Sequence, residues 1–209
     1  MTIIIGIIIA FLLAVFFIAR AGKNKASSKA IFDGYLESIK NAAEVGERAY
    51  RAQMETLGAH PNVRGIALAR LATSLFPVAS YAIAESSDAI PSSVTEFSPV
   101  SGKDVWNLAS GIALQPLGNI RGTPHFSEIK EDTHYSINQF INLINSTNVL
   151  SSSAAIEPAI HLLSPIWCRA FEISGVPRNN LINGYAAQYV TSGMLQLLDV
   201  YDLLATSRS

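Results

Sequence analysis

The sequence predicts an all-α protein, with one hydrophobic helix at the N-terminus followed by a helical domain of about six or seven helices. Residues 2–19 contain no charged side chain. Beyond them, apolar residues recur at spacings of three and four in one segment after another, as on one face of a helix. No pair of strands is evident, because the extended candidate 94–100 contains Pro99 and has no partner.

The first segment, TIIIGIIIAFLLAVFFIA, is apolar throughout. As a helix of 1.5 Å rise per residue it covers about 27 Å, close to the hydrocarbon thickness of a bilayer. We predict a transmembrane signal-anchor at residues 1–21, a linker at 22–28 and the helical domain at 29–209. A cleaved signal peptide is the alternative, because Ala19-Arg20-Ala21 has the form of a cleavage site. The length of the apolar run, and the lack of Lys or Arg before it, favour a retained anchor.

Positive charge follows the apolar segment and is absent before it. Residues 20–70 hold nine Lys and Arg against five Asp and Glu, whereas residues 71–209 hold six against eleven. Positive flanks stay on the cytoplasmic side, so a single-pass protein with a cytoplasmic C-terminal domain is predicted. The same side chains can contact anionic headgroups of the bilayer. They are Arg20, Lys23, Lys25 and Lys29.

The composition limits the kinds of partner and cofactor that we expect for this chain. The net charge is −1, which does not favour nucleic acid. Charged residues make up 15% of the chain, against a typical value of about 25% for soluble domains. The one cysteine, Cys168, excludes an intrachain disulfide and is expected to be a small buried side chain. No cofactor is predicted.

The helices of the domain follow in order. Residues 29–57 form the most amphipathic segment, ended by Gly58. Residues 63–84 form the next helix, interrupted or kinked at Pro77. A short helix is expected at 103–114 after a loop. The face of the first helix is Leu36, Ile39, Ala43, Gly46, Tyr50, Met54 and Leu57.

Three more helices complete the domain. One begins near Pro124 or Ser127 and ends near Ile144, and a second spans 154–174, with Pro165 forcing a kink or break. The last spans 179–205. Its predicted apolar side includes Ile182, Tyr185, Tyr189, Met194 and Leu197.

The C-terminal part is poor in charge. Residues 154–206 contain six charged side chains in fifty-three positions, about half of the typical number. Interface cores are depleted of charge and enriched in aromatic residues, so this stretch is a candidate partner surface. The alternative is that it forms the centre of the protein's own bundle. The interface candidates are Trp167, Phe171, Tyr185, Tyr189 and Tyr201.

The sequence contains no phosphate-binding loop, nucleophile elbow, HExxH or CxxC motif. One set of side chains has the spacing of metal ligands: Glu131 and His134 at i, i+3, and Glu157 and His161 at i, i+4. A di-iron bundle needs a second Glu-x-x-His motif and two more carboxylates, so the set is incomplete and a weak candidate. His161 stands among apolar neighbours and is expected to be a core residue bonded to Glu157.

Two classes of function remain. The first is a membrane-anchored accessory or scaffolding subunit of a larger membrane complex, acting through protein–protein contacts with the other subunits. The second is a membrane-tethered helical enzyme or metal-binding protein that uses Glu131, His134, Glu157 and His161. A secreted protein released by cleavage after Ala21 is a third possibility.

Overall fold

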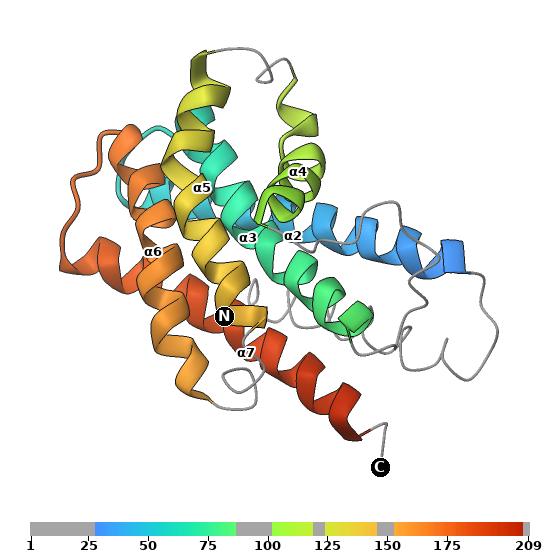
Figure 1. Ribbon diagram of the computed structural model, residues 1–209. Coiled ribbons are helices and arrows are strands. Elements are labelled where there is room, and N and C mark those ends of the chain that lie inside the picture. Colours follow the sequence, from blue (N-terminus) through green and yellow to red (C-terminus); the bar gives the residue numbers. More distant parts are fainter. Residues whose placement is uncertain (1–27, 87–101, 119–123, 146–152, 207–209) are drawn as a thin grey trace.

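A computed structural model describes residues 28–86, 102–118, 124–145 and 153–206 (Figure 1). These residues form six α-helices and no strand, which confirms the all-α prediction. None of the helices in these ranges is both long enough and apolar enough to span a membrane. The predicted anchor 1–21 and linker residues 22–27 lie outside the described residues, and Ser28, the last predicted linker residue, is the first residue of α2. The helices are α2 (Ser28–Thr56), α3 (Val63–Ser86), α4 (Gly102–Ala113), α5 (Pro124–Asn145), α6 (Ile156–Ile173) and α7 (Asn180–Thr206), with short 3-10 turns at Gln115–Leu117 and Ser153–Ala155.

Helix α3 lies at the centre of the fold and packs against all five other helices (Figure 1). Every residue from Gly65 to Tyr81 is buried except Thr73. A helix that is apolar on all sides has to be surrounded by protein, and the sequence of α3 meets that description. The other helices therefore form a layer around α3.

The predicted apolar face of α2 is confirmed. Ile39, Ala43, Tyr50 and Met54 are buried, and α2 packs mainly on α3. The helix ends where expected, at Gly58, which has a φ of 66°. The amide of Ala59 donates a hydrogen bond back to the carbonyl of Met54, at 2.9 Å, as in glycine-terminated helices.

The sequence predicted an interruption or kink at Pro77 and a kink or break at Pro165. Helices α3 and α6 both continue through these prolines, so neither helix is broken there. A proline inside a helix costs about 3 kcal/mol. Burial on both sides of each proline offsets this cost, since Phe76, Val78 and Ile166 are all in the core.

The face of α7 differs from the prediction. Its buried side consists of Ile182, Ala186, Val190, Met194 and Leu197. Tyr185 and Tyr189 are only half-buried and lie beside this face. Small residues allow α7 to pack closely on α3 and α6, and the two larger tyrosine side chains lie at the edge of this face.

Candidate interaction groove

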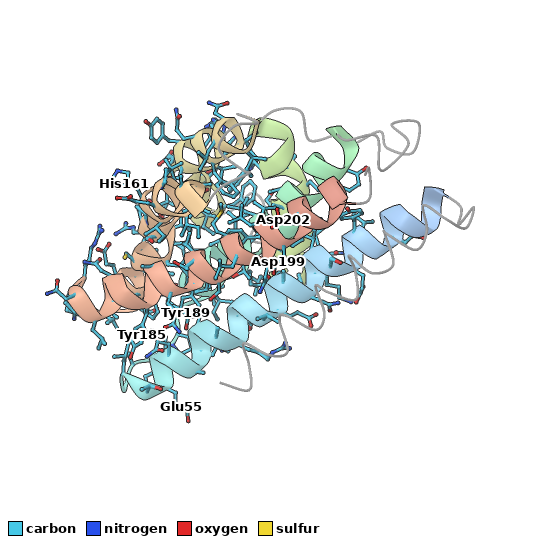
Figure 2. The ribbon with its side chains drawn as sticks, turned by 90° about the horizontal axis from the view of Figure 1, so that it is seen from below. Glu55, His161, Tyr185, Tyr189, Asp199 and Asp202 are labelled. Carbon is cyan, nitrogen blue, oxygen red and sulfur yellow. The ribbon has the colours of Figure 1, made fainter. Side chains whose placement is uncertain are left out.

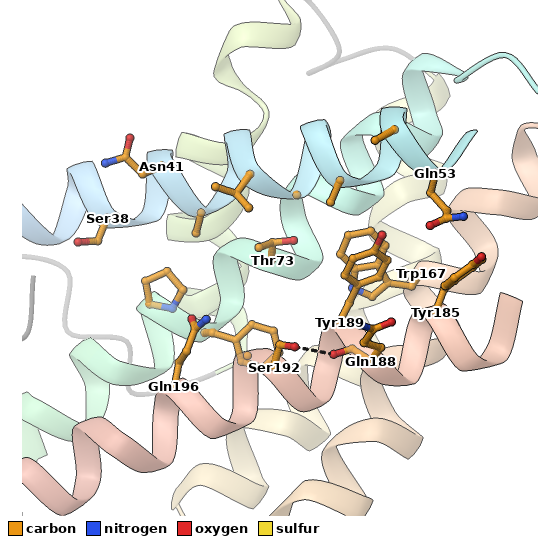
Figure 3. A pocket seen from close by; sticks show the side chains of 18 of the residues that line it. Ser38, Asn41, Gln53, Thr73, Trp167, Tyr185, Gln188, Tyr189, Ser192 and Gln196 are labelled. Carbon is orange, nitrogen blue, oxygen red and sulfur yellow. Dashed lines mark hydrogen bonds between the residues drawn. The ribbon is translucent and has the colours of Figure 1, made fainter. Parts of the chain in front are cut away.

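A groove runs between α2 and α7, with α3 as its floor (Figure 3). Both helices pack on α3, but they make almost no contact with each other. They run in opposite directions, so the start of α2 lies near the end of α7 (Figures 2 and 3). The cavity has a volume of about 290 Å³. Its α2 side is lined by Ser38, Asn41, Ala42, Val45, Gly46, Ala49, Ala52, Gln53 and Thr56.

Two glycines bring the walls close to the floor. A Cβ atom on Gly46 would lie 2.3 Å from Oγ1 of Thr73 and 2.7 Å from the carbonyl oxygen of Ala69. A Cβ atom on Gly193 would lie 2.3 Å from the ring of Phe76. Real Cβ atoms do not approach so closely, so only glycine fits at either position. The groove is therefore a consequence of two close helix contacts with α3.

The groove has an aromatic end. The rings of Trp167 and Tyr189 stack, with their centroids 4.3 Å apart and their planes at 22°. Trp167 is buried, and Tyr189 covers it on the groove side together with neighbouring Tyr185 (Figure 3). Burial, and to a smaller extent Tyr185, raises the pKa of Tyr189, so its hydroxyl is neutral at physiological pH.

Among the described residues, no Asp, Glu, Lys, Arg or His lines the groove. Its polar groups are neutral amides and hydroxyls. Such a surface offers hydrogen bonds and aromatic contact to a bound group. The polar side chains are Ser38, Asn41, Gln53, Thr56, Thr73, Tyr185, Gln188, Tyr189, Ser192 and Gln196.

A buried ion pair fixes α2 on α3 behind the groove. Arg70 is 2% exposed, and its Nη1 lies 2.6 Å from Oε2 of Glu47. Its Nε donates a hydrogen bond to the carbonyl of Ala113, at the end of α4. Burial alone would raise the pKa of Glu47, but hydrogen bonds from Arg51 and Arg70 outweigh burial and lower it.

A second ionic cluster joins α3, α5 and α6. Arg64 pairs with both Glu128 and Asp132. Arg169 lies 3.6 Å from Asp132 and 3.6 Å from Glu172. Four of these side chains, Arg64, Glu128, Asp132 and Arg169, form ion pairs between helices, and Glu172 pairs with Arg169 within α6, so we assign the cluster a structural role.

The candidate metal ligands are separated. Glu131, Glu157 and His161 are exposed, and His134 is half-buried with Nδ1 3.4 Å from the side-chain nitrogen of Asn138. In the described ranges no three His, Cys, Asp or Glu side chains gather around a common point. The expectation that His161 is a core residue is wrong, since it lies on the outside of α6 (Figure 2). The buried side of α6 instead contains Leu163 and Ile166.

The interface candidates divide into two sets. Trp167 and Phe171 lie in the protein's own core, at 2% and 0% exposure. Tyr185 and Tyr189 line the groove. The side chain of Tyr201 lies outside the described part, as do those of the membrane flank. The flank residues are Arg20, Lys23, Lys25 and Lys29.

The sequence did not reveal the α2 wall of the groove. Small residues at Ala42 and Gly46 indicated only that some helix could approach closely. Gln53 is the residue that could have indicated this wall, because it is a neutral polar residue seven positions after Gly46 and next to the buried Met54. It becomes part of a groove only because α7 lies opposite, and α7 is more than a hundred residues away in the chain.

Comparisons of the chain with protein-family models, with curated proteins and with solved structures gave no match.

Proposed function

We propose that the chain is a membrane-anchored accessory or scaffolding subunit of a larger membrane complex, and that it acts through protein–protein contacts. The observation that carries this proposal is the uncharged groove between α2 and α7. It is open, carries two tyrosines and four side-chain amides among its nineteen lining residues, and is suited to holding a partner.

The position of the groove relative to the N-terminal segment supports a membrane partner. Helix α2 begins at Ser28, nine residues after Ala19. Nine residues span at most about 30 Å. With residues 2–19 in a bilayer and the domain on the cytoplasmic side, the start of α2 lies within about 30 Å of the membrane surface. A partner that is itself a membrane subunit is then within reach.

The proposal is tested by extracting the full chain, tagged after Ser209, with mild detergent. We expect a defined set of membrane subunits to co-purify in fixed ratio to the chain. A variant whose apolar segment is interrupted, Ile8→Lys with Leu12→Lys, is expected to lose both membrane association and these partners. An unrelated single-span protein with the same tag is the control.

Two outcomes would contradict the proposal. One is a chain that purifies alone from membranes that contain it at native levels. The other is one equivalent or more of bound iron, zinc or manganese that is lost in His134→Ala and in His161→Ala. The second outcome would support the membrane-tethered metal-protein alternative with Glu131, His134, Glu157 and His161.

A further inference from the structure

We propose that the groove between α2 and α7 binds an extended, uncharged peptide segment of a partner subunit, held by side-chain amides from both walls. The inference rests on the proposed function, because it specifies the contact through which such a subunit would act. It names the conformation, the length and the charge of the bound segment.

Three amide side chains carry the argument. Gln53 points from α2 toward α7, and Gln188 and Gln196 point from α7 toward α2 (Figure 3). None of these three amides makes a hydrogen bond to another described residue. Each offers one acceptor and two donor hydrogens, which is the complement of a free peptide group.

The conformation of the occupant follows from those amides. An extended segment has backbone N–H and C=O groups that lose water on entering a groove and need new partners. A helix already satisfies its own backbone groups internally and would offer the amides of Gln53 and Gln188 no backbone partner. Amides on two facing walls therefore favour an extended chain over a helix.

The spacing of the amides sets a length. Gln188 and Gln196 are eight residues apart on α7, or about 12 Å along the helix axis. The full lining of α7, from Tyr185 to Gln196, covers about 16 Å. At about 3.3 Å per residue, an extended segment crosses this distance in four to five residues.

The lining also sets the charge and character of the segment. A charged side chain placed in a groove without any Asp, Glu, Lys or Arg would lose hydration and gain no counter-charge. Small residues on α2, such as Ala42 and Ala49, leave room for apolar side chains in the middle. The stacked pair of Trp167 and Tyr189 provides an aromatic surface at one end.

The test uses the full chain in detergent and a panel of N-acetylated, C-amidated hexapeptides made of Ala, Gly, Ser, Thr and Leu. Trp106→Phe leaves Trp167, the only remaining tryptophan, as a fluorescence reporter beneath Tyr189. We expect members of the panel to bind saturably with sub-millimolar Kd. The same peptides with a central Lys or Glu are expected to bind at least tenfold more weakly, whichever the sign of the charge.

A matched set of variants locates the binding. Gln53→Ala combined with Gln188→Ala is expected to weaken peptide binding at least fivefold. Gln139→Ala, which removes the same group from α5 outside the groove, is expected to leave binding unchanged. Far-UV circular dichroism of all variants checks that the helices are retained.

Several results would overturn the inference. They are a panel without any saturable binder, equal binding of charged and neutral peptides, or unchanged binding in the double Gln variant. Tighter binding of a helix-stapled peptide of the same composition, or self-association of the chain that the double variant abolishes, would assign the groove to another occupant.

The peptide titration and the co-purification test different proposals, so a negative result in one does not imply a negative result in the other. If no peptide binds but membrane subunits co-purify, the function stands and the groove is not the contact. If peptides bind but the chain is extracted alone, the groove stands and the role in a membrane complex does not.

Discussion

Arg70 is the one charged side chain that is fully buried in the described residues, and its charge is balanced by Glu47 alone. Glu47 is itself about four-fifths buried, so water screens the pair only weakly. Removing one partner of such a pair leaves the other charge buried without compensation. This pair therefore determines how firmly α2 is held against α3, and with it the α2 wall of the groove.

We predict that Glu47→Gln lowers the free energy of unfolding by about 2–4 kcal/mol, because Arg70 keeps its charge in a buried site. Urea unfolding of the full chain in mild detergent, followed by circular dichroism, measures this. Glu37→Gln is the control, since Glu37 pairs with Lys40 at 3.9 Å with both side chains mostly exposed. It is expected to change stability by less than about 0.5 kcal/mol.

The same variant carries a pH signature. The pKa of Glu47 is lowered in the folded protein, so its carboxylate contributes stability above its unfolded pKa. This contribution is lost as the pH falls through the lower, folded pKa. The stability difference between wild type and Glu47→Gln should therefore be constant above about pH 5.5 and shrink steadily below about pH 4.5. A difference that stays constant down to pH 3 would show that the carboxylate charge is not the cause.

At the scale of elements, the close contacts of α7 with α3 can be tested through two glycines of the same helix. Gly193 faces the ring of Phe76, whereas a Cβ atom on Gly184 would meet no atom within 4 Å. Alanine in place of a mid-helix glycine gains up to about 1 kcal/mol of helix stability. Overpacking a core costs about 1–3 kcal/mol.

We predict opposite signs for the two substitutions. Gly184→Ala should raise the free energy of unfolding by about 0.5–1 kcal/mol, because only the helix propensity changes. Gly193→Ala should lower it by about 1–2 kcal/mol, because the new methyl group displaces Phe76 from its place in the groove floor. Urea unfolding of both variants under the same conditions measures the sign and size of each change in the free energy of unfolding. A stabilising Gly193→Ala would mean that α7 can shift away from α3 without cost.

The elements themselves were largely predictable from sequence. Regular apolar spacing and terminating glycines located the helices to within one or two residues, as at α2 and Gly58. The buried side of α7 was not predictable, because apolar residues lie on more than one side of this helix. The helical spacing of apolar residues does not show whether Tyr189 or Val190 is buried. That choice is made by the small residues Ala186 and Gly193, which let the helix approach its neighbours.

The candidate site was beyond sequence reasoning for a related reason. The groove exists because α2 and α7 are both held by α3 at a separation that they do not close. That separation depends on the two close contacts that Gly46 and Gly193 make with α3, which lie far apart in the chain, and not on any local pattern. The charge-poor C-terminal stretch, predicted as a partner surface, contains Tyr185 and Tyr189 of the groove lining. It also contains Trp167, which is buried in the core and lines the groove from beneath Tyr189.

At the scale of the whole molecule, the orientation of the proposed anchor decides which compartment the groove faces. Basic residues follow the apolar segment closely, at positions 20, 23, 25 and 29. Because positively charged flanks are retained on the cytoplasmic side, we predict that a reporter fused after Ser209 is cytoplasmic. Protease protection, or a reporter that is active on one side of the membrane only, measures this.

Substituting the basic residues tests whether their charges determine the orientation. Lys23, Lys25 and Lys29 changed together to glutamate should yield a mixed orientation, whereas the same change at Lys130 of α5, more than a hundred residues from the segment, should not. A wild-type C-terminus on the outer side would overturn the orientation. If the mature chain then also began at Gly22, cleavage after Ala21 would have released the domain, and the groove would serve a secreted protein instead of a membrane subunit.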